Sequence, residues 1–127
     1  MPEAFATLPL PARPDVIAPD GSEVRLLLRL AGGSMAHFLL NPGEVSKAVV
    51  HRTVEELWFI LAGQGEMWRS QDGREEITAL SPGLGLSIPV GTRFQFRCIG
   101  DAPLEAVAVT MPPWPGADEA VFVAGAW

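Results

Sequence analysis

Short runs of alternating apolar and polar residues recur along this chain of 127 residues. Glycine, proline, asparagine and serine separate the runs, and such turn signals return about every ten residues from Glu23 onward. This spacing is typical of an all-β sandwich or barrel. The strands that the pattern predicts are Val24–Leu30, Met35–Leu40, Val45–His51, Leu57–Leu61, Glu66–Ser70, Glu76–Leu80, Leu84–Ile88, Phe94–Ile99 and Leu104–Met111.

Helical periodicity is not sustained over three turns anywhere in the sequence. The nearest exception is Ala117–Val123, which is compatible with a helical turn. We therefore expect a β domain over residues 23–111, preceded by an extended arm over residues 1–22 that carries five prolines. Residues 112–127 are rich in proline and tryptophan, and we expect this tail to pack on the β domain.

Composition narrows the class of protein. The chain is 48% hydrophobic and 19% charged, which is enough for one folded core. Its net charge is −6 and its basic residues are scattered singly, so we expect no nucleic-acid partner. No apolar run approaches the roughly 20 residues that span a membrane, and no signal peptide is recognisable, so we expect no membrane partner and a cytoplasmic location. The one cysteine, Cys98, excludes an internal disulfide and is expected to be a buried thiol.

The stretch from Gly43 to Gly63 combines turn residues with polar groups that can carry chemistry. His51 lies five residues before Glu56, and the apolar run Leu57–Leu61 follows at once. Gly63 closes the run with a turn signal. A histidine and a carboxylate on neighbouring strand segments are typical of a metal site or of a hydrogen-bonded acid–base pair.

A second stretch repeats the order of strand, turn and strand, with Gly83, Pro89 and Gly91 at its turns. Together the two stretches resemble the two sequence motifs of the cupin barrel, because the turn residues of both motifs match in identity and in spacing. The resemblance implies a cupin-like jelly-roll β-barrel, also called a double-stranded β-helix. It implies a small single-domain cupin of the conserved-barrel type, with the N-terminal arm outside the barrel.

The resemblance is incomplete where cupins place their metal ligands. His51 and Glu56 match, but Val49 stands at the position of the first histidine. In the second motif Phe94 stands at the histidine position and Cys98 at the asparagine position. The family set of three or four nitrogen and oxygen ligands suits iron, manganese, nickel, copper or zinc. Since two ligands are retained, we expect either no cofactor or one divalent transition metal on His51 and Glu56.

Few other side chains could complete a ligand set. His37, on the preceding expected strand, is the only other histidine and becomes a third candidate ligand if it faces inward. Glu55 is expected opposite to Glu56, because neighbouring residues of a regular strand point to opposite faces. Arg93 is permanently cationic and cannot ligate, and Gln95 is a weak ligand. A structural histidine in a strand is the alternative interpretation of His37.

Aromatic residues are expected to share the pocket with the motif residues. Alternation places Trp58 on the same face as Glu56, so an inward face would make the pocket apolar and aromatic. The expected ligand-binding residues are His51, Glu56, Trp58, Arg93, Phe94 and Gln95. His51 and Glu56 are also the candidate catalytic residues, because a hydrogen bond between them would orient the imidazole. A strand histidine without function is the alternative for His51.

Three functions remain open at this point. The first is a cupin barrel that binds a small organic acid or an aromatic compound, with a reduced or absent metal site and Arg93 as a candidate anion partner. The second is a metal-dependent cupin enzyme, of dioxygenase or isomerase type, that uses His51 and Glu56. The third is a non-catalytic dimerisation or sensory module. Cupins commonly pair through sheet edges, so we expect a homodimer. The sequence favours the first function.

Overall fold

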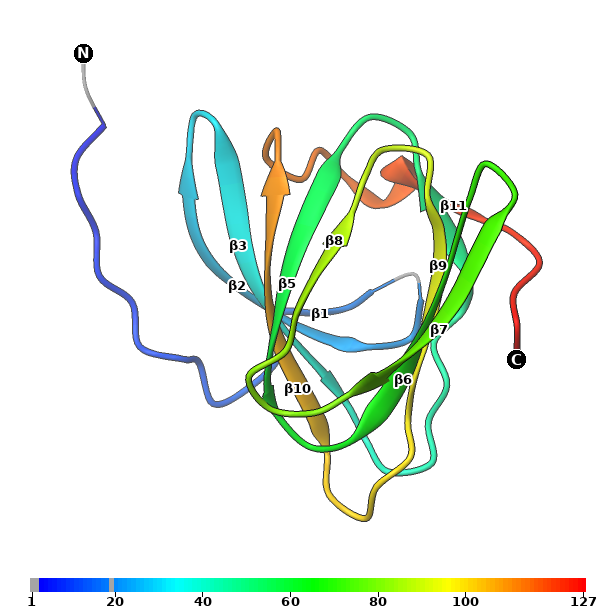
Figure 1. The fold of residues 1–127 in the computed structure, drawn as a ribbon. Coiled ribbons are helices and arrows are strands. Elements are labelled where there is room, and N and C mark those ends of the chain that lie inside the picture. The colour runs from blue at the N-terminus through cyan, green and yellow to red at the C-terminus, as the bar shows by residue number, and fades with distance from the viewer. Residues whose placement is uncertain (1–2, 19) are drawn as a thin grey trace.

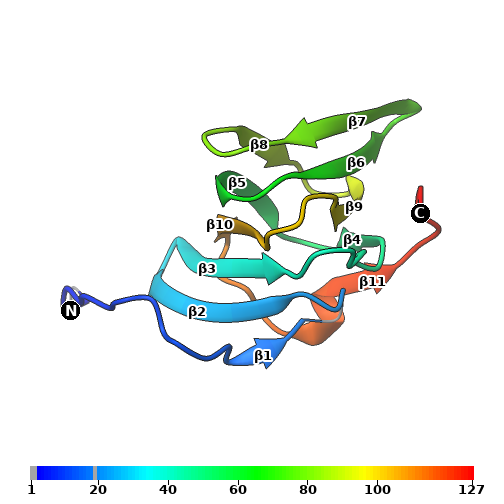
Figure 2. The same cartoon turned by 90° about the horizontal axis from the view of Figure 1, so that it is seen from below.

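Two antiparallel sheets face each other in the computed structural model, which describes residues 3–18 and 20–127 (Figures 1 and 2). The strands are β1 (Val16–Ile17), β2 (Glu23–Leu30), β3 (Gly33–Leu40), β4 (Val49–His51), β5 (Glu55–Ala62), β6 (Gly65–Gln71), β7 (Arg74–Leu80), β8 (Gly85–Ile88), β9 (Arg93–Cys98), β10 (Leu104–Met111) and β11 (Ala120–Phe122). One sheet has the order β1-β2-β3-β10-β5-β8, and the other has the order β11-β4-β9-β6-β7. The prediction of an all-β fold is confirmed.

The strands largely follow the sequence pattern, and differences include β4 and the segment that follows residue 116. β4 begins only at Val49, and Val45 makes an isolated bridge with Arg97 instead of continuing the strand. The helical turn is confined to a 3₁₀ segment, η1 (Ala117–Glu119), because the residues that follow pair with β4 as β11. Within the described ranges, the molecule has no helix of the length and apolarity that a membrane span requires.

The core lies between the inner faces of the two sheets. On β5 the side chains of Glu56, Trp58 and Ile60 point inward and are buried, whereas Leu57 and Phe59 point outward and are about half exposed. β10 shows the same alternation along its whole length. This period of two is what a sheet requires when one face packs on a core. The apolar run Leu57–Leu61 therefore contributes side chains to both faces of the sheet.

The turn residues of the two motifs have a structural reason. Gly63 adopts a φ of 85°, and a Cβ at this position would collide with the backbone of Pro103. Gly91 adopts a φ of 82° in an open turn, so its requirement is conformational and not steric. These glycines shape the corners of the barrel whatever chemistry its interior supports.

Both terminal segments contact outer faces of the barrel, although residues 3–10 are exposed. Arg25 on β2 donates from Nε to the carbonyl oxygen of Pro11 at 2.8 Å and from Nη2 to that of Ala12 at 3.1 Å. At the other end, the Trp127 ring lies under the Arg97 guanidinium at 4.2 Å. The division into arm, barrel and tail stays a prediction, since β1 lies within residues 1–22 and β11 within residues 112–127. Residues 1, 2 and 19 of the expected arm lie outside the described residues.

Candidate functional site

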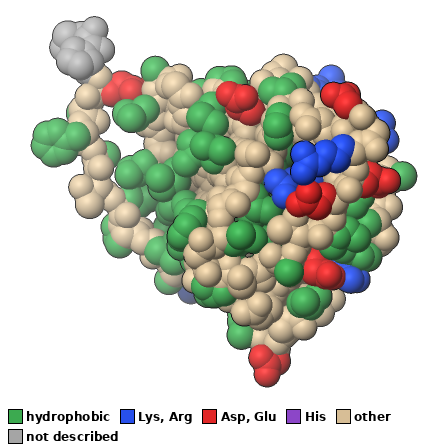
Figure 3. All heavy atoms as spheres, in the orientation of Figure 1, with side chains coloured by type: hydrophobic (Ala, Val, Ile, Leu, Met, Phe, Trp, Pro, Cys, Tyr) green, Lys and Arg blue, Asp and Glu red, His purple; other side chains and the backbone are tan. Residues whose placement is uncertain are grey.

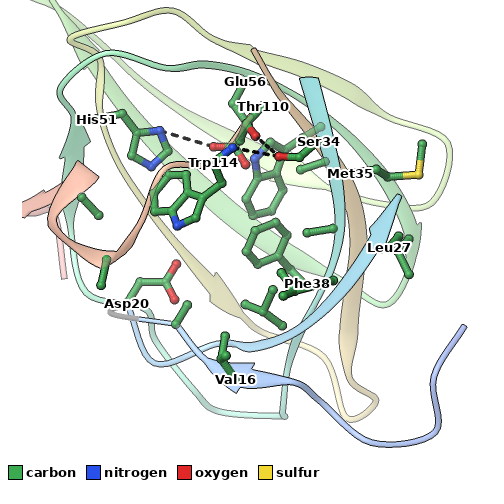
Figure 4. Close-up of a pocket in the computed structure, with 18 of the residues that line it drawn as sticks. Val16, Asp20, Leu27, Ser34, Met35, Phe38, His51, Glu56, Thr110 and Trp114 are labelled. Carbon is green, nitrogen blue, oxygen red and sulfur yellow. Dashed lines mark hydrogen bonds and ion pairs between the residues drawn. The ribbon is translucent and has the colours of Figure 1, made fainter. Parts of the chain in front are cut away.

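A cavity of about 510 Å³ lies inside the barrel, next to the seam where β1 and β2 approach β11 (Figure 4). Small-molecule sites usually have volumes of ~300–1,000 Å³. Most of its walls are apolar side chains from both sheets and from residues 114–120. The polar side chains of the lining, apart from the indoles, are Asp20, Arg29, Ser34, His51, Glu56 and Thr110. The cavity is therefore an apolar chamber with a few polar groups.

His51 and Glu56 meet at one wall of this cavity (Figure 4). His51 is the last residue of β4 and Glu56 the second of β5, and the short connection between the strands turns both side chains inward. Their exposed fractions are 6% and 3%. His51 Nδ1 lies 3.5 Å from Glu56 Oε1, and neither atom has a well-formed hydrogen bond within the described structure. The five-residue spacing of His51 and Glu56 in the first motif thus brings the two side chains together as one buried pair.

Burial decides the charge of this pair. Desolvation raises the pKa of Glu56 to about 8, and the charge of Asp20 adds to this effect. The Trp58 indole opposes the shift, although its Nε1 falls short of hydrogen-bond geometry. Desolvation lowers the pKa of His51 to about 4, against the attraction of the Glu119 carboxylate. At pH 7 the carboxyl is protonated and the imidazole is neutral, so the 3.5 Å contact is a neutral pair rather than a salt bridge.

Aromatic rings form much of the remaining wall. Trp58 stacks on Phe38 with a centroid distance of 5.1 Å and an interplanar angle of 9°. Phe96 and Phe94 stand edge-on to the Trp58 ring, at 5.0 Å and 6.5 Å. The His51 ring meets Phe94 at 5.2 Å and Trp114 at 5.0 Å, in both cases edge-on. Trp58 and Phe94 are thus brought together with His51, as the motif alignment predicts.

Sequence reasoning missed several groups of the lining. Trp114 comes from the proline-rich tail, and its backbone N–H donates to Ser34 Oγ at 2.9 Å. Ser34 Oγ in turn lies 2.6 Å from Thr110 Oγ1. Asp20 accepts from the backbone N–H and the hydroxyl of Ser22, and burial raises the pKa of its carboxyl. For Trp114 the sequence offers one indication, because the tail that contains it is expected to pack on the barrel.

Arg93 and Gln95 do not line the cavity, which corrects their assignment to the ligand site. On β9 the buried rings of Phe94 and Phe96 face inward, so the residues that alternate with them face outward. Arg93 is exposed. Gln95 is buried beneath the C-terminal segment, where its Nε2 donates to the carbonyl oxygens of Ser46 at 2.8 Å and Trp127 at 3.1 Å. Arg93 therefore cannot neutralise an anion in the cavity.

His37 also lies away from the cavity, which corrects its assignment as a third metal ligand. The residues of β3 that line the cavity from this face include Ala36 and Phe38, so His37 between them points to the outer face of the sheet. There it is 2% exposed, and its Nε2 lies 2.9 Å from Glu105 Oε1. The alternative interpretation of a structural histidine fits this environment.

The donor set of the cavity does not fit a tightly held transition metal. Val49 and Phe94, with exposed fractions of 2% and 3%, fill ligand positions with hydrocarbon. Across residues 3–18 and 20–127, no three histidine, cysteine or carboxylate side chains come close enough to hold one ion. Protein metal sites of this type use three or four such ligands. His51 and Glu56 alone would leave most of the coordination sphere to solvent.

Residues 36–110 match the family model described as the cupin domain, and the chain belongs to this family. The match runs from β3 to β10 and includes both motif stretches. A comparison with curated protein sequences finds no match. The expected small cupin with a double-stranded β-helix is thereby confirmed.

Solved structures share the fold at low sequence identity. BH2720 from Bacillus halodurans has a TM-score of 0.67 and 20% identity over 73% of this chain and 72% of that one. A recombinant oxalate oxidase in complex with glycolate has a TM-score of 0.74 and 19% identity over 92% and 62%. A Lactobacillus farciminis oxalate decarboxylase, in a formate complex, has a TM-score of 0.71 and 17% identity over 80% and 31%. The chain spans less than two thirds of these two enzymes, and the likeness shows the fold alone.

Proposed function

We propose that the barrel binds a small neutral organic molecule that is apolar or aromatic over most of its surface and carries one hydrogen-bonding group. The neutral pair of His51 and Glu56 carries this proposal. The pair lies at the wall of an apolar cavity of about 510 Å³, and its facing atoms lack well-formed hydrogen bonds. Buried polar atoms are normally satisfied, so unsatisfied atoms in a cavity indicate a place for a ligand group or a water. Binding in this proposal requires no metal.

The charges around the cavity favour a neutral ligand over an organic acid. Arg29 is the one cationic side chain among the described lining residues, and it is exposed to solvent. Glu56 is protonated at neutral pH because its pKa is raised to about 8. An anion in the cavity would lose its hydration without gaining a buried counter-charge. A hydroxyl or carbonyl group can instead exchange hydrogen bonds with the protonated carboxyl and the neutral imidazole.

The structural neighbours support a binding role for the barrel but suggest a different ligand for this chain. The oxalate oxidase structure holds glycolate and the oxalate decarboxylase structure holds formate. Both molecules are small acids. In this chain Val49 and Phe94 give the corresponding interior an apolar character, and Arg93 is turned away from it. We therefore extend the role of small-molecule binding, but not the acid specificity, to this protein.

Titration with matched probes tests the proposal. Benzyl alcohol, benzoate and benzylamine share one ring and differ in charge, and the tryptophan fluorescence of the full chain reports binding because Trp58 and Trp114 line the cavity. We expect saturable binding of benzyl alcohol, weaker binding of both ions, and no effect of a chelator. Glu56→Leu should weaken benzyl alcohol binding, whereas Arg93→Gln should not. Stoichiometric metal in the purified protein, or binding that a chelator abolishes, would contradict the proposal.

We also propose that the protein pairs with a second copy, because the outer face of one sheet is apolar. Leu57, Phe59 and Leu61 on β5 have exposed fractions of 52%, 48% and 48%. β10 places Val107 and Val109 beside Phe59 and Leu57 on the same face. Contiguous exposed apolar patches of this kind mark interaction surfaces. Sedimentation at micromolar concentration should show a dimer that Phe59→Lys converts to a monomer. A monomeric wild-type protein would exclude this pairing.

A further inference from the structure

A second hollow of about 200 Å³ lies at the other seam of the barrel, between the β6–β7 hairpin and β8. Its lining consists of Arg69, Gln71, Arg74, Glu76, Ser87, Pro89 and Thr92. Among the described residues it shares no lining residue with the large cavity. Figure 3 shows basic and acidic side chains gathered on the right half of this face, where Figure 1 draws β6, β7 and β9. The hollow is polar and charged, whereas the large cavity is apolar.

Strand alternation directs these side chains to the inner face of the hairpin. Met67 on β6 is fully buried in the core, so Arg69 and Gln71 lie on the same face further along the strand. Leu80 on β7 is buried as well, and Glu76 shares its face. The hairpin extends beyond the apolar core, and its inner face becomes the wall of the hollow.

Arg69 is held by three hydrogen bonds, which leave two of its five N–H groups unused. Its Nη1 donates to the carbonyl oxygen of Ser87 at 3.0 Å, and its Nη2 donates to Thr78 Oγ1 at 3.1 Å and to Glu76 Oε1 at 3.4 Å. The Nε of Arg69 is buried and has no hydrogen-bond partner in the described part of the chain. A guanidinium fixed in this way presents its unused N–H groups in defined directions.

Two further side chains add unused donors. Thr92, in the turn between β8 and β9, is 2% exposed, and its Oγ1 has no partner in the described structure. Arg74 uses one nitrogen, Nη2, to reach Glu76 Oε2 at 3.0 Å, and its side chain is otherwise 79% exposed. The Arg69 Nε–H and the Thr92 hydroxyl are therefore buried polar groups without a partner at the hollow, within the described residues. A bound group with several acceptor atoms would satisfy them.

The charges of the lining also favour a ligand with acceptor atoms and a negative charge. Arg69 and Arg74 are cations, and Glu76 is the one acidic side chain among the described lining residues. Hydrogen bonds from Thr78 and Arg74 hold the pKa of Glu76 below its usual range, so the three groups sum to one positive charge. This local excess lies in a chain whose net charge is −6.

We propose that this hollow binds a small oxyanion, a carboxylate or a phosphate, between the guanidinium groups of Arg69 and Arg74 and the hydroxyl of Thr92. Guanidinium forks match the paired oxygens of both anions, and charge-assisted hydrogen bonds are stronger than neutral ones. A volume of about 200 Å³ limits the bound group to a few heavy atoms. The site is independent of the ligand proposed for the large cavity.

Arginine Nε–H signals in ¹H–¹⁵N spectra of the full chain test the proposal directly. Sodium phosphate and sodium acetate are titrated separately, with sodium chloride at matched ionic strength as the control. We expect the Arg69 Nε–H signal, assigned with Arg69→Lys, to shift and to saturate with one or both oxyanions. The two titrations distinguish phosphate from carboxylate. No saturable shift with either anion, or an equal shift with chloride, would overturn the proposal.

Variants then locate the site. Arg74→Gln should weaken the apparent affinity about tenfold, and Thr92→Val about threefold, because they remove a charged and a neutral hydrogen bond respectively. Arg52→Gln removes another exposed arginine that lies outside the hollow, and it should leave the titration unchanged. Equal weakening by Arg74→Gln and Arg52→Gln would reduce the effect to net charge and refute the site. The wild-type titration keeps this test valid even if Thr92→Val does not fold.

Discussion

The two seams of the barrel place carboxyl groups in opposite electrostatic states. At the seam of β1, β2 and β11, Glu56 is buried among aromatic rings and its pKa is raised to about 8. At the seam of β7 and β8, hydrogen bonds from Thr78 and Arg74 lower the pKa of Glu76. Both side chains face inward from a strand, so strand position does not set their charge. The hydrogen-bond donors and the solvent around each carboxyl set its charge.

A third carboxyl shows that burial is not sufficient to neutralise a glutamate. Glu119 is 4% exposed, and desolvation alone would raise its pKa. Its oxygens accept from the hydroxyl and backbone N–H of Thr53 and from the backbone N–H of Val54, and these bonds hold its pKa below the usual range. Glu119 thereby ties η1 to the β4–β5 connection beside the cavity. Glu56 Oε1 lacks such donors within the described residues, and the proposed function assigns it to a ligand.

The largest expected effect comes from removing the Glu119 carboxylate. Glu119→Ala leaves the donors of Thr53 and Val54 unsatisfied and should lower the free energy of unfolding by about 3 kcal/mol. Urea denaturation at pH 7 measures the change. Asp118→Ala, at the exposed neighbouring position, is the control and should change stability by less than about 0.5 kcal/mol. Equal effects would mean that Glu119 has no anchoring role.

The pH dependence of stability should separate Glu56 from Glu76. The folded-state pKa of Glu56 is about 8 against an ordinary value of 4.5, so its contribution falls as pH rises between these values. His51, at about 4 against 6.5, opposes this fall only below pH 6.5. Stability should therefore drop by about 1.5 kcal/mol from pH 6.5 to 8, because the limiting slope of ~1.4 kcal/mol per unit flattens at both ends of this interval.

Denaturant unfolding of variants across that pH interval checks this slope. Glu56→Gln cannot ionise and should remove the drop. Glu76→Gln should retain it, because the pKa of Glu76 is lowered and the group is already ionised at pH 6.5. A wild-type profile that stays flat from pH 6.5 to 8 would show that Glu56 is not neutral in the folded protein.

Oxyanion binding at the other seam should raise stability by mass action. At ten times the dissociation constant, phosphate or acetate should add about 1.4 kcal/mol to the free energy of unfolding. Thermal unfolding at constant ionic strength measures the gain. Arg74→Gln should lose most of it, and Glu56→Gln should keep it in full. Loss of the gain in Glu56→Gln would mean that the two seams do not act independently.

The smallest expected effect concerns the outward face of β9. Arg93→Gln should change stability by less than about 0.5 kcal/mol and leave the affinity for benzyl alcohol unchanged, because Arg93 is exposed and lies outside the cavity. Fluorescence titration and urea denaturation give both values. A marked loss of binding would place Arg93 at the ligand after all.

Much of the fold and one part of the site were predictable from sequence. The period of two along β5 predicts that Glu56 and Trp58 share a face, and both line the cavity. On β9 the same alternation separates Phe94 from Arg93 and Gln95, so the sequence already indicates that these three side chains do not share one face. On β3, His37 is buried on the outer face. A strand covered on both sides shows no clean alternation, and its inward face cannot be chosen from sequence.

The sequence by itself determined the strands, the glycine turns and the meeting of His51 with Glu56, because these depend on neighbours within one or two strands. The tertiary structure alone decided that Trp114 lines the cavity and that Arg69 and Thr92 share a hollow. It also decided the charge of each carboxyl, since desolvation and donors come from segments distant in the chain. Local patterns specify which residues of a strand share a face. Only the assembled barrel specifies what that face contacts.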